Sequence, residues 1–76
     1  MNQHRRNVLQ KARATLEQVI DSISSIRDDE QEALDNLPDG IQESERGQKM
    51  EDAIEAMESA IESVGEAIES LEKASS

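Results

Sequence analysis

The sequence predicts an all-α protein, namely an antiparallel helical hairpin that self-associates into a coiled-coil-like helical bundle, most simply a dimeric four-helix bundle. Aliphatic residues recur at steps of three and four along both halves of the chain, and a Pro and a Gly interrupt this pattern near the middle. The chain has 76 residues, with no aromatic residue and no Cys. We therefore expect a single helical-hairpin domain over residues 1–76, with helices at 3–35 and 45–73 and a turn at 36–44.

The helix at 45–73 contains a seven-residue unit that occurs three times in succession, as AIEAMES, AIESVGE and AIESLEK. This heptad places two apolar rows next to each other. Position a holds Ile54, Ile61 and Ile68, and position d holds Met50, Met57, Val64 and Leu71. Ala residues at position g allow another helix to approach closely, whereas Glu55, Glu62 and Glu69 at position b are expected to face water.

The helix at 3–35 has the same steps in a less regular form. Its seam is predicted to consist of two rows, with Leu9, Leu16, Ile23 and Leu37 in one and Ala12, Val19, Ile26 and Ala33 in the other. Val8, Ile20 and Leu34 flank this seam, so the apolar face is broad enough to contact two neighbouring helices. Glu30 interrupts the first row, and four interpretations stay open. It reaches water near the end of the bundle, it pairs with Arg27 or Arg46, it specifies register, or it contacts a partner.

The turn is predicted from Pro38, which disfavours continuation of the first helix, and from Gly40, which tolerates unusual backbone angles. Ser44 is a candidate N-cap of the second helix, and Glu45 lies favourably in its first turn. A connection this short makes the two helices antiparallel neighbours. The basic start of the first helix then lies next to the acidic end of the second, so that Arg5, Arg6, Lys11 and Arg13 approach Glu62, Glu66, Glu69 and Glu72.

Self-association is expected because each helix of a lone hairpin has only one neighbour, which leaves its apolar face partly exposed. Ordering a residue costs on the order of 1.5 kcal/mol, and partial burial of aliphatic side chains leaves too little stabilisation to offset that cost. The core of the oligomer is predicted to contain Leu16, Ile23, Ile54, Met57, Ile61, Val64, Ile68 and Leu71. A higher oligomer, or a host protein that covers the same faces, is the alternative to a dimer.

The chain is strongly acidic, since eight Lys and Arg residues and eighteen Asp and Glu residues give a net charge of −10. Residues 1–27 sum to +3, and residues 28–76 sum to −13. Such a surface repels phosphate backbones and anionic membranes, so direct nucleic-acid binding is disfavoured. No apolar run approaches the ~20 residues of a membrane span, and the N-terminus lacks a secretory signal. We therefore expect a cytoplasmic protein with no membrane partner.

Enzymatic chemistry has little support in the sequence, because the only His is His4, near a terminus, and no Cys is present to act as a nucleophile. We expect no catalytic residue, no cofactor and no metal site. The segment that begins at Asp35 is similar to the start of a calcium-binding loop, but Leu37 and Arg46 occupy positions where that loop needs oxygen ligands. Weak binding of a divalent ion by the acidic residues at 28–35 is a minor alternative.

The segment from Asp35 to Ser63 resembles a segment of small acidic helical proteins encoded by bacteria, phages and mobile elements. The most distinctive part of the resemblance lies in Asn36, Leu37, Pro38, Gln42, Ser44, Glu45 and Arg46. The resemblance covers the turn and most of the second helix, and the first helix lies outside it. It implies no activity, but it implies an accessory factor of a phage or mobile element, a setting in which small inhibitors of host systems are frequent.

The sequence therefore predicts a non-enzymatic interaction protein that binds a host protein through its acidic surface, with nucleic-acid mimicry as a narrower form of the same hypothesis. Candidate partner contacts are Gln42, Glu43, Glu45 and Arg46 at the tip of the hairpin and Glu55, Glu62 and Glu69 along the second helix. Two alternatives stay open. One is a structural assembly element. The other is an oligomer that sequesters a phosphorylated small ligand, such as a nucleotide, through His4, Arg5, Arg6, Lys11 and Arg13.

Overall fold

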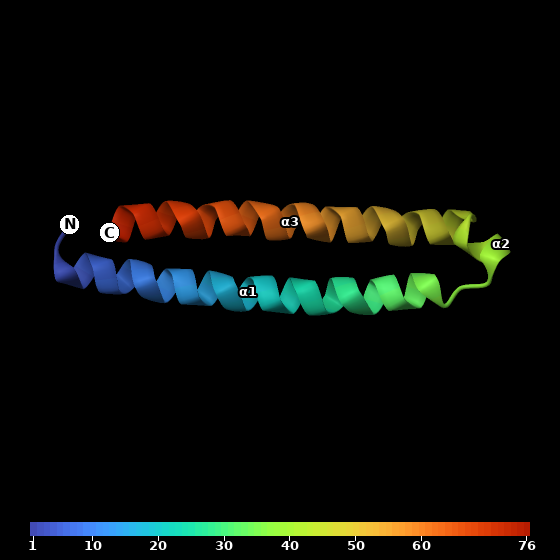
Figure 1. Cartoon of the computed structure of the whole chain (residues 1–76), viewed down its shortest axis with the longest axis horizontal. Coiled ribbons are helices and arrows are strands. Elements are labelled where there is room, and N and C mark those ends of the chain that lie inside the picture. Colours follow the sequence, from blue (N-terminus) through green and yellow to red (C-terminus); the bar gives the residue numbers. More distant parts are fainter.

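The computed structural model describes all 76 residues, and every regular element in it is a helix. α1 spans Gln3–Asp35, α2 spans Asp39–Gln42 and α3 spans Glu45–Ser75. α1 and α3 lie side by side and run in opposite directions, so the two chain termini lie at the same end (Figure 1). The prediction of an all-α protein is confirmed. There are three helices rather than two, however, and the last one ends at residue 75 rather than 73.

The molecule is a thin rod with extents of 58 × 14 × 12 Å. Its radius of gyration is 17.3 Å, whereas a compact domain of this length has a radius of gyration of about 11 Å. Its accessible surface is 5479 Å², and a compact monomer of this mass exposes about 4,600 Å². Only four of the 76 residues are buried. A single copy of the chain therefore has little core.

The N-terminal end of α1 is capped by Asn2, whose side-chain Oδ1 accepts a hydrogen bond from the backbone N–H of Arg5 at 2.9 Å. This cap satisfies one of the backbone donors that the first turn of any helix leaves free. This cap was not predicted from the sequence. At the other end, the backbone N–H of Asn36 donates to the carbonyl of Glu32 at 3.1 Å, and the helix stops before Pro38 as predicted.

The connection between the long helices, predicted as a turn over 36–44, contains the short helix α2. Pro38 precedes α2, and its carbonyl accepts hydrogen bonds from the N–H groups of Ile41 at 2.8 Å and Gln42 at 3.1 Å. The fixed φ of Pro, −57° here, favours the start of a helix as much as it disfavours the continuation of one. Ser44 caps α3 as predicted, because its hydroxyl accepts a hydrogen bond from the N–H of Gly47 at 3.5 Å.

Gly47 allows the start of α3 to lie directly against α2. It is buried, and a Cβ added there would overlap the carbonyl oxygen of Gln42 and lie 2.9 Å from that of Ile41. These neighbours are backbone atoms, which cannot move aside as the tip of a flexible side chain would. Only Gly fits at this position, a requirement that was not predicted from the sequence.

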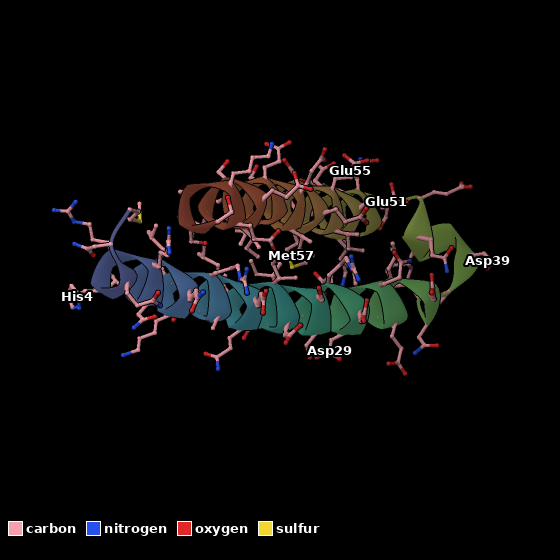
Figure 2. The ribbon with its side chains drawn as sticks, turned by 60° about the vertical axis from the view of Figure 1, so that its left-hand side comes forward. His4, Asp29, Asp39, Glu51, Glu55 and Met57 are labelled. Atoms are coloured by element: carbon pink, nitrogen blue, oxygen red, sulfur yellow. The ribbon has the colours of Figure 1, made fainter.

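The seam of α3 agrees with the prediction. Ile54 and Ile68 at position a are only 5% and 9% exposed. The other members of the two rows, Met50, Met57, Ile61, Val64 and Leu71, are half-buried. Met57 points into the space between the two long helices (Figure 2). The strict heptad of this half of the chain therefore identifies the buried side of α3.

The seam of α1 agrees with the prediction for only one of its two rows. Leu9, Leu16, Ile23 and Leu37 are half-buried, and Glu30 occupies its expected place among them. The second predicted row, Ala12, Val19, Ile26 and Ala33, is exposed, so that part of the prediction is wrong. The row that takes its place consists of Arg6, Arg13, Ile20, Arg27 and Leu34. In the notation used for α3, this row is position a of α1 and the Leu9 row is position d.

Electrostatics and side-chain shape explain the choice of the arginine row. An Arg side chain can lay its aliphatic stem along apolar surface while its guanidinium stays at the edge. Arg13 is half-buried in the seam and places its Nη1 3.6 Å from Oε1 of Glu72 in the acidic α3. Glu30 forms no ion pair, because Arg27 pairs with Asp28 at 3.1 Å instead, so the interpretation that Glu30 pairs with Arg27 or Arg46 is wrong.

Candidate functional site

Arg13 shows how the flanks of the two long helices are arranged. Its guanidinium lies 3.8 Å from Glu17 of α1 and 3.6 Å from Glu72 of α3. Glu17 and Glu72 both occupy position e, next to the seam. Because one side chain contacts both, the e positions of the two helices lie on the same face of the rod. The g positions flank the other side of the seam and therefore lie on the opposite face.

The face that contains the b and e positions carries ten exposed carboxylates and no Lys or Arg. We name it the acid face, and it consists of Glu17, Asp21, Asp28, Asp35, Glu51, Glu55, Glu58, Glu62, Glu69 and Glu72. The predicted stripe of Glu55, Glu62 and Glu69 is therefore one part of a surface that both long helices build. The four members from α1 were not identified from the sequence, because their common face depends on the arginine row of the seam.

Most of the acid face is not neutralised by neighbouring cations. Arg13 contacts Glu17 and Glu72, and Arg27 contacts Asp28. The Arg27 and Asp28 side chains are 32% and 70% exposed, and exposed pairs of this kind contribute about 0–1 kcal/mol. The remaining seven carboxylates form no ion pair. The face therefore presents strong negative potential to solvent.

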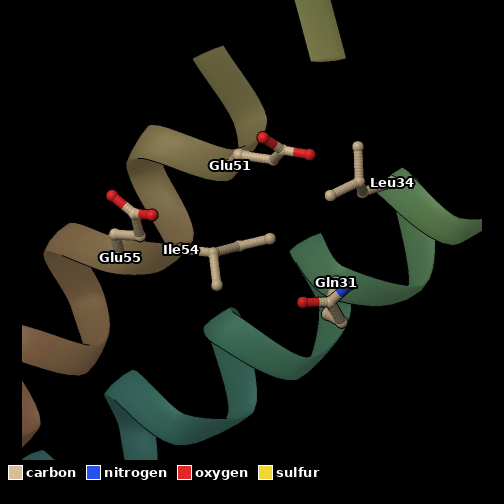
Figure 3. A pocket seen from close by; sticks show the side chains of 5 residues that line it. All are labelled: Gln31, Leu34, Glu51, Ile54 and Glu55. Atoms are coloured by element: carbon tan, nitrogen blue, oxygen red, sulfur yellow. The ribbon is translucent and has the colours of Figure 1, made fainter. Parts of the chain in front are cut away.

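An open hollow of about 230 Å³ lies in the acid face, toward the α2 end of the rod (Figure 3). Leu34 of α1 and Ile54 of α3 point toward each other at its floor, and they are 7% and 5% exposed. Glu51 and Glu55 line the hollow from α3, and Gln31 lines it from α1. An apolar floor beside carboxylates suits a Lys or Arg side chain, whose stem is aliphatic and whose end is cationic.

The predicted contacts at the tip of the rod have different environments. The side-chain amide of Gln42 donates to the carbonyls of Leu37 at 3.1 Å and Asp35 at 3.3 Å, so Gln42 ties α2 to the end of α1. Glu43, Glu45 and Arg46 are exposed, and Glu45 lies 3.5 Å from Lys49. Glu45 and Arg46, with Lys49 and Met50, also line an open hollow of about 420 Å³.

The basic residues near the N-terminus do not converge in one copy of the chain. Arg6 and Arg13 belong to the seam, whereas His4 and Lys11 lie on the outer side of α1 and Arg5 lies on the face opposite the acid face. Of the predicted pairs with the acidic end of α3, only Arg13 with Glu72 forms. The Nε atom of Arg6 is buried without a hydrogen-bond partner. The arrangement of these five residues in one copy of the chain therefore does not support a phosphate site, and such a site stays a prediction.

The residues predicted for the oligomer core all lie along the seam between α1 and α3 of the same chain. Ile54 and Ile68 are buried there, and the six others are half-buried, namely Leu16, Ile23, Met57, Ile61, Val64 and Leu71. Their part in an oligomer stays a prediction. The large aliphatic residues that one copy leaves exposed are different ones, namely Met1, Val8, Val19, Ile26 and Ile41.

Comparison of the chain with protein-family models, with curated proteins and with solved structures gives no match. No group of three or more His, Asp or Glu side chains is arranged to hold a metal ion. Neither long helix contains a stretch that is both long and apolar enough to cross a membrane. The surfaces of the rod are therefore the candidate functional sites.

Proposed function

We propose that the protein is a non-enzymatic interaction protein that binds the basic surface of another protein through the acid face. The observation that carries this proposal is the set of ten exposed carboxylates with no Lys or Arg among them. A face of this kind attracts cationic partners over about a Debye length and accelerates their association. It also repels nucleic acids and other acidic proteins, which gives the interaction selectivity.

The density of charge on the acid face supports nucleic-acid mimicry as the narrower form of the proposal. The carboxylates of α3 extend from Glu51 to Glu72, a span of about 32 Å at 1.5 Å per residue. Arg13 and Glu72 set the register of the helices, so the carboxylates of α1 lie beside the same span. Ten charges over this length amount to about one every 3 Å, close to the 3.4 Å per charge of one DNA strand. A basic groove that binds a nucleic-acid strand is therefore a suitable partner surface.

The hollow between Leu34 and Ile54 is the proposed anchor for one Lys or Arg side chain of the partner. A cation there would lie near Glu51 and Glu55 while its stem covers the two apolar residues. Buried basic side chains of this kind are frequent sources of binding energy at protein interfaces. The remainder of the acid face would then provide orientation and association rate more than affinity.

The biological setting follows from the resemblance of the segment 35–63 to small acidic helical proteins of bacteria, phages and mobile elements. We infer an accessory or inhibitory factor that acts on a host protein. The hairpin is further proposed to self-associate into a helical bundle, most simply a dimeric four-helix bundle. Its small buried core and its surface of 5479 Å² support this inference.

The test is a pull-down from bacterial lysate at low and high salt with three forms of the chain. The first is the wild type, and the second carries Glu51→Gln and Glu55→Gln at the hollow. The matched control carries Glu32→Gln and Glu66→Gln, which change the net charge equally on the outer side of each helix. We expect a partner that the wild type and the control retain at low salt, that the hollow variant loses, and that high salt releases.

Two results would contradict the proposal. Recovery of no partner at either salt concentration would remove the support for an interaction protein. Equal loss of the partner with the hollow variant and with the control would show that total charge, rather than the acid face, determines binding.

A further inference from the structure

The face opposite the acid face contains the g and c positions of both long helices. Between residues 8 and 26 of α1 and between residues 53 and 74 of α3, these positions hold only Val, Ile, Ala, Ser and Thr. We name this surface the uncharged face. Val8, Val19 and Ile26 are 52%, 38% and 59% exposed on it. No element of the same chain covers them.

We propose that the uncharged face is covered by the uncharged face of a second copy of the chain. This inference rests on the proposed self-association and specifies the surface that carries it. Electrostatic repulsion between the two copies favours this contact. Each copy has a net charge of −10, and ten carboxylates lie on the acid face. Contact through the uncharged faces turns both acid faces outward and keeps their charges apart.

The size of the broad side of the rod also favours this contact. One broad side of the rod measures 58 by 14 Å, about 800 Å² for each copy, and the uncharged stretch of α3 covers about 32 Å of this length at 1.5 Å per residue. Stable protein interfaces bury about 800 Å² on each partner. The chain exposes 5479 Å², roughly 900 Å² more than a compact monomer of its mass. Covering one broad side therefore removes about the amount of surface that the fold leaves in excess.

The two flanks of the uncharged face also differ in the size of their side chains. On α1 the uncharged face carries the branched residues Val19 and Ile26, and on α3 it carries Ala60 and Ala67 at the corresponding g positions. Larger side chains beside small ones let two helical layers interdigitate at close distance. The charged residues at g and c lie beyond this stretch, and Arg5, Asp29, Arg46 and Lys49 carry both signs.

The experiment measures mass by light scattering over a dilution series for the wild type, Ile26→Glu and Ser25→Glu. Both variants add one carboxylate to α1 at exposed neighbouring positions, but Ser25 lies on the outer side of the helix. The wild type should have twice the chain mass of 8.4 kDa. Ile26→Glu should weaken the dimer about 100-fold or more, since a twofold interface contains the new charge twice, and Ser25→Glu should change it by less than about 3-fold.

A second variant, Ala67→Glu, places a carboxylate on the α3 half of the uncharged face and should also dissociate the dimer. Circular dichroism at each concentration shows whether a dissociated variant has also lost its helices. Loss of helix that occurs only at concentrations below the dissociation midpoint, where the dimer has separated, agrees with the proposal. A wild type of 8.4 kDa at every concentration would overturn both this inference and the proposed self-association. A dimer that all three variants leave intact would overturn the inference alone.

Discussion

The acid face and the uncharged face flank the same seam but differ in nearly every property that governs association. The acid face carries ten carboxylates, whereas the uncharged face carries no charged residue. The heptad register alone separates them, because b and e lie on one side of the seam and c and g on the other. The comparison indicates that one periodic pattern can provide a surface for a basic partner and a surface for a second copy.

The difference also has a consequence for stability. Carboxylates three or four residues apart along α3 repel one another, which opposes folding of the helix that carries most of the acid face. The seam that must resist this repulsion contains only three buried hydrophobic residues. Association through the uncharged face would therefore stabilise the fold that presents the acid face.

The largest effect is expected from Ile54→Ala, at the seam that both faces share. Ile54 is 5% exposed, and its truncation should lower the free energy of unfolding by about 2–5 kcal/mol. Denaturant unfolding measures this change. The control is Ile41→Ala in α2, where the side chain is 41% exposed and the loss should be much smaller. Equal losses at the two sites would mean that the seam is not the core of the chain.

Two Gly substitutions in α3 should have opposite signs. Gly47→Ala should lower the free energy of unfolding by about 1–3 kcal/mol, because the new methyl group meets the backbone of α2. Gly65→Ala should raise it by about 0.5–1 kcal/mol, since Gly65 lies at an e position of the acid face with no atom near its absent Cβ. Thermal unfolding of both variants tests this. A loss of stability in Gly65→Ala would show that other atoms pack against the acid face, whereas the comparison of the two faces leaves the acid face open to solvent.

Substitution of Gln42 separates a structural role from partner contact. Gln42→Ala removes two side-chain hydrogen bonds to the end of α1 and should cost about 1–2 kcal/mol in unfolding experiments. Glu43→Gln, at the exposed neighbouring residue, is the control and should have almost no effect on stability. Reduced partner binding by Gln42→Ala at unchanged stability would instead favour the predicted contact role.

A small effect, similar to that of Gly65→Ala, is expected from the combined replacement of Glu55, Glu62 and Glu69 by Gln on the acid face. It relieves repulsion with carboxylates three and four residues away, so stability should rise by about 1 kcal/mol at low salt and by less at high salt. Denaturant unfolding at two salt concentrations provides the measurement. A fall in stability would indicate that these carboxylates make favourable contacts in the folded state.

The fold of α3 could be predicted from the sequence because every a and d position from Met50 to Leu71 is aliphatic, with no competing row. The seam of α1 could not, since the Leu9 row has candidate rows on both sides. The seam contains the row with Arg6, Arg13 and Arg27, and the aliphatic row that begins at Ala12 is exposed. A pattern of hydrophobic residues treats Arg as polar and so does not include the arginine row, although the aliphatic stem of Arg can pack like an apolar side chain.

The acid face was predicted only in part for the same reason. The row of Glu55, Glu62 and Glu69 is visible in the sequence, but the carboxylates of α1 join it only when the orientation of α1 is known. The short helix α2 and the close approach at Gly47 depend on backbone contacts between segments, which side-chain periodicity does not report.

The most direct test of the two-face account is the reactivity of single thiols, since the chain has no Cys of its own. Ala67→Cys places a thiol on the uncharged face, and Glu69→Cys places one on the acid face. Both positions are exposed in one copy of the chain. With a neutral maleimide, the account predicts that the thiol at 67 reacts slowly and faster on dilution, while the thiol at 69 reacts at one rate throughout. Equal, concentration-independent rates at the two positions would contradict it.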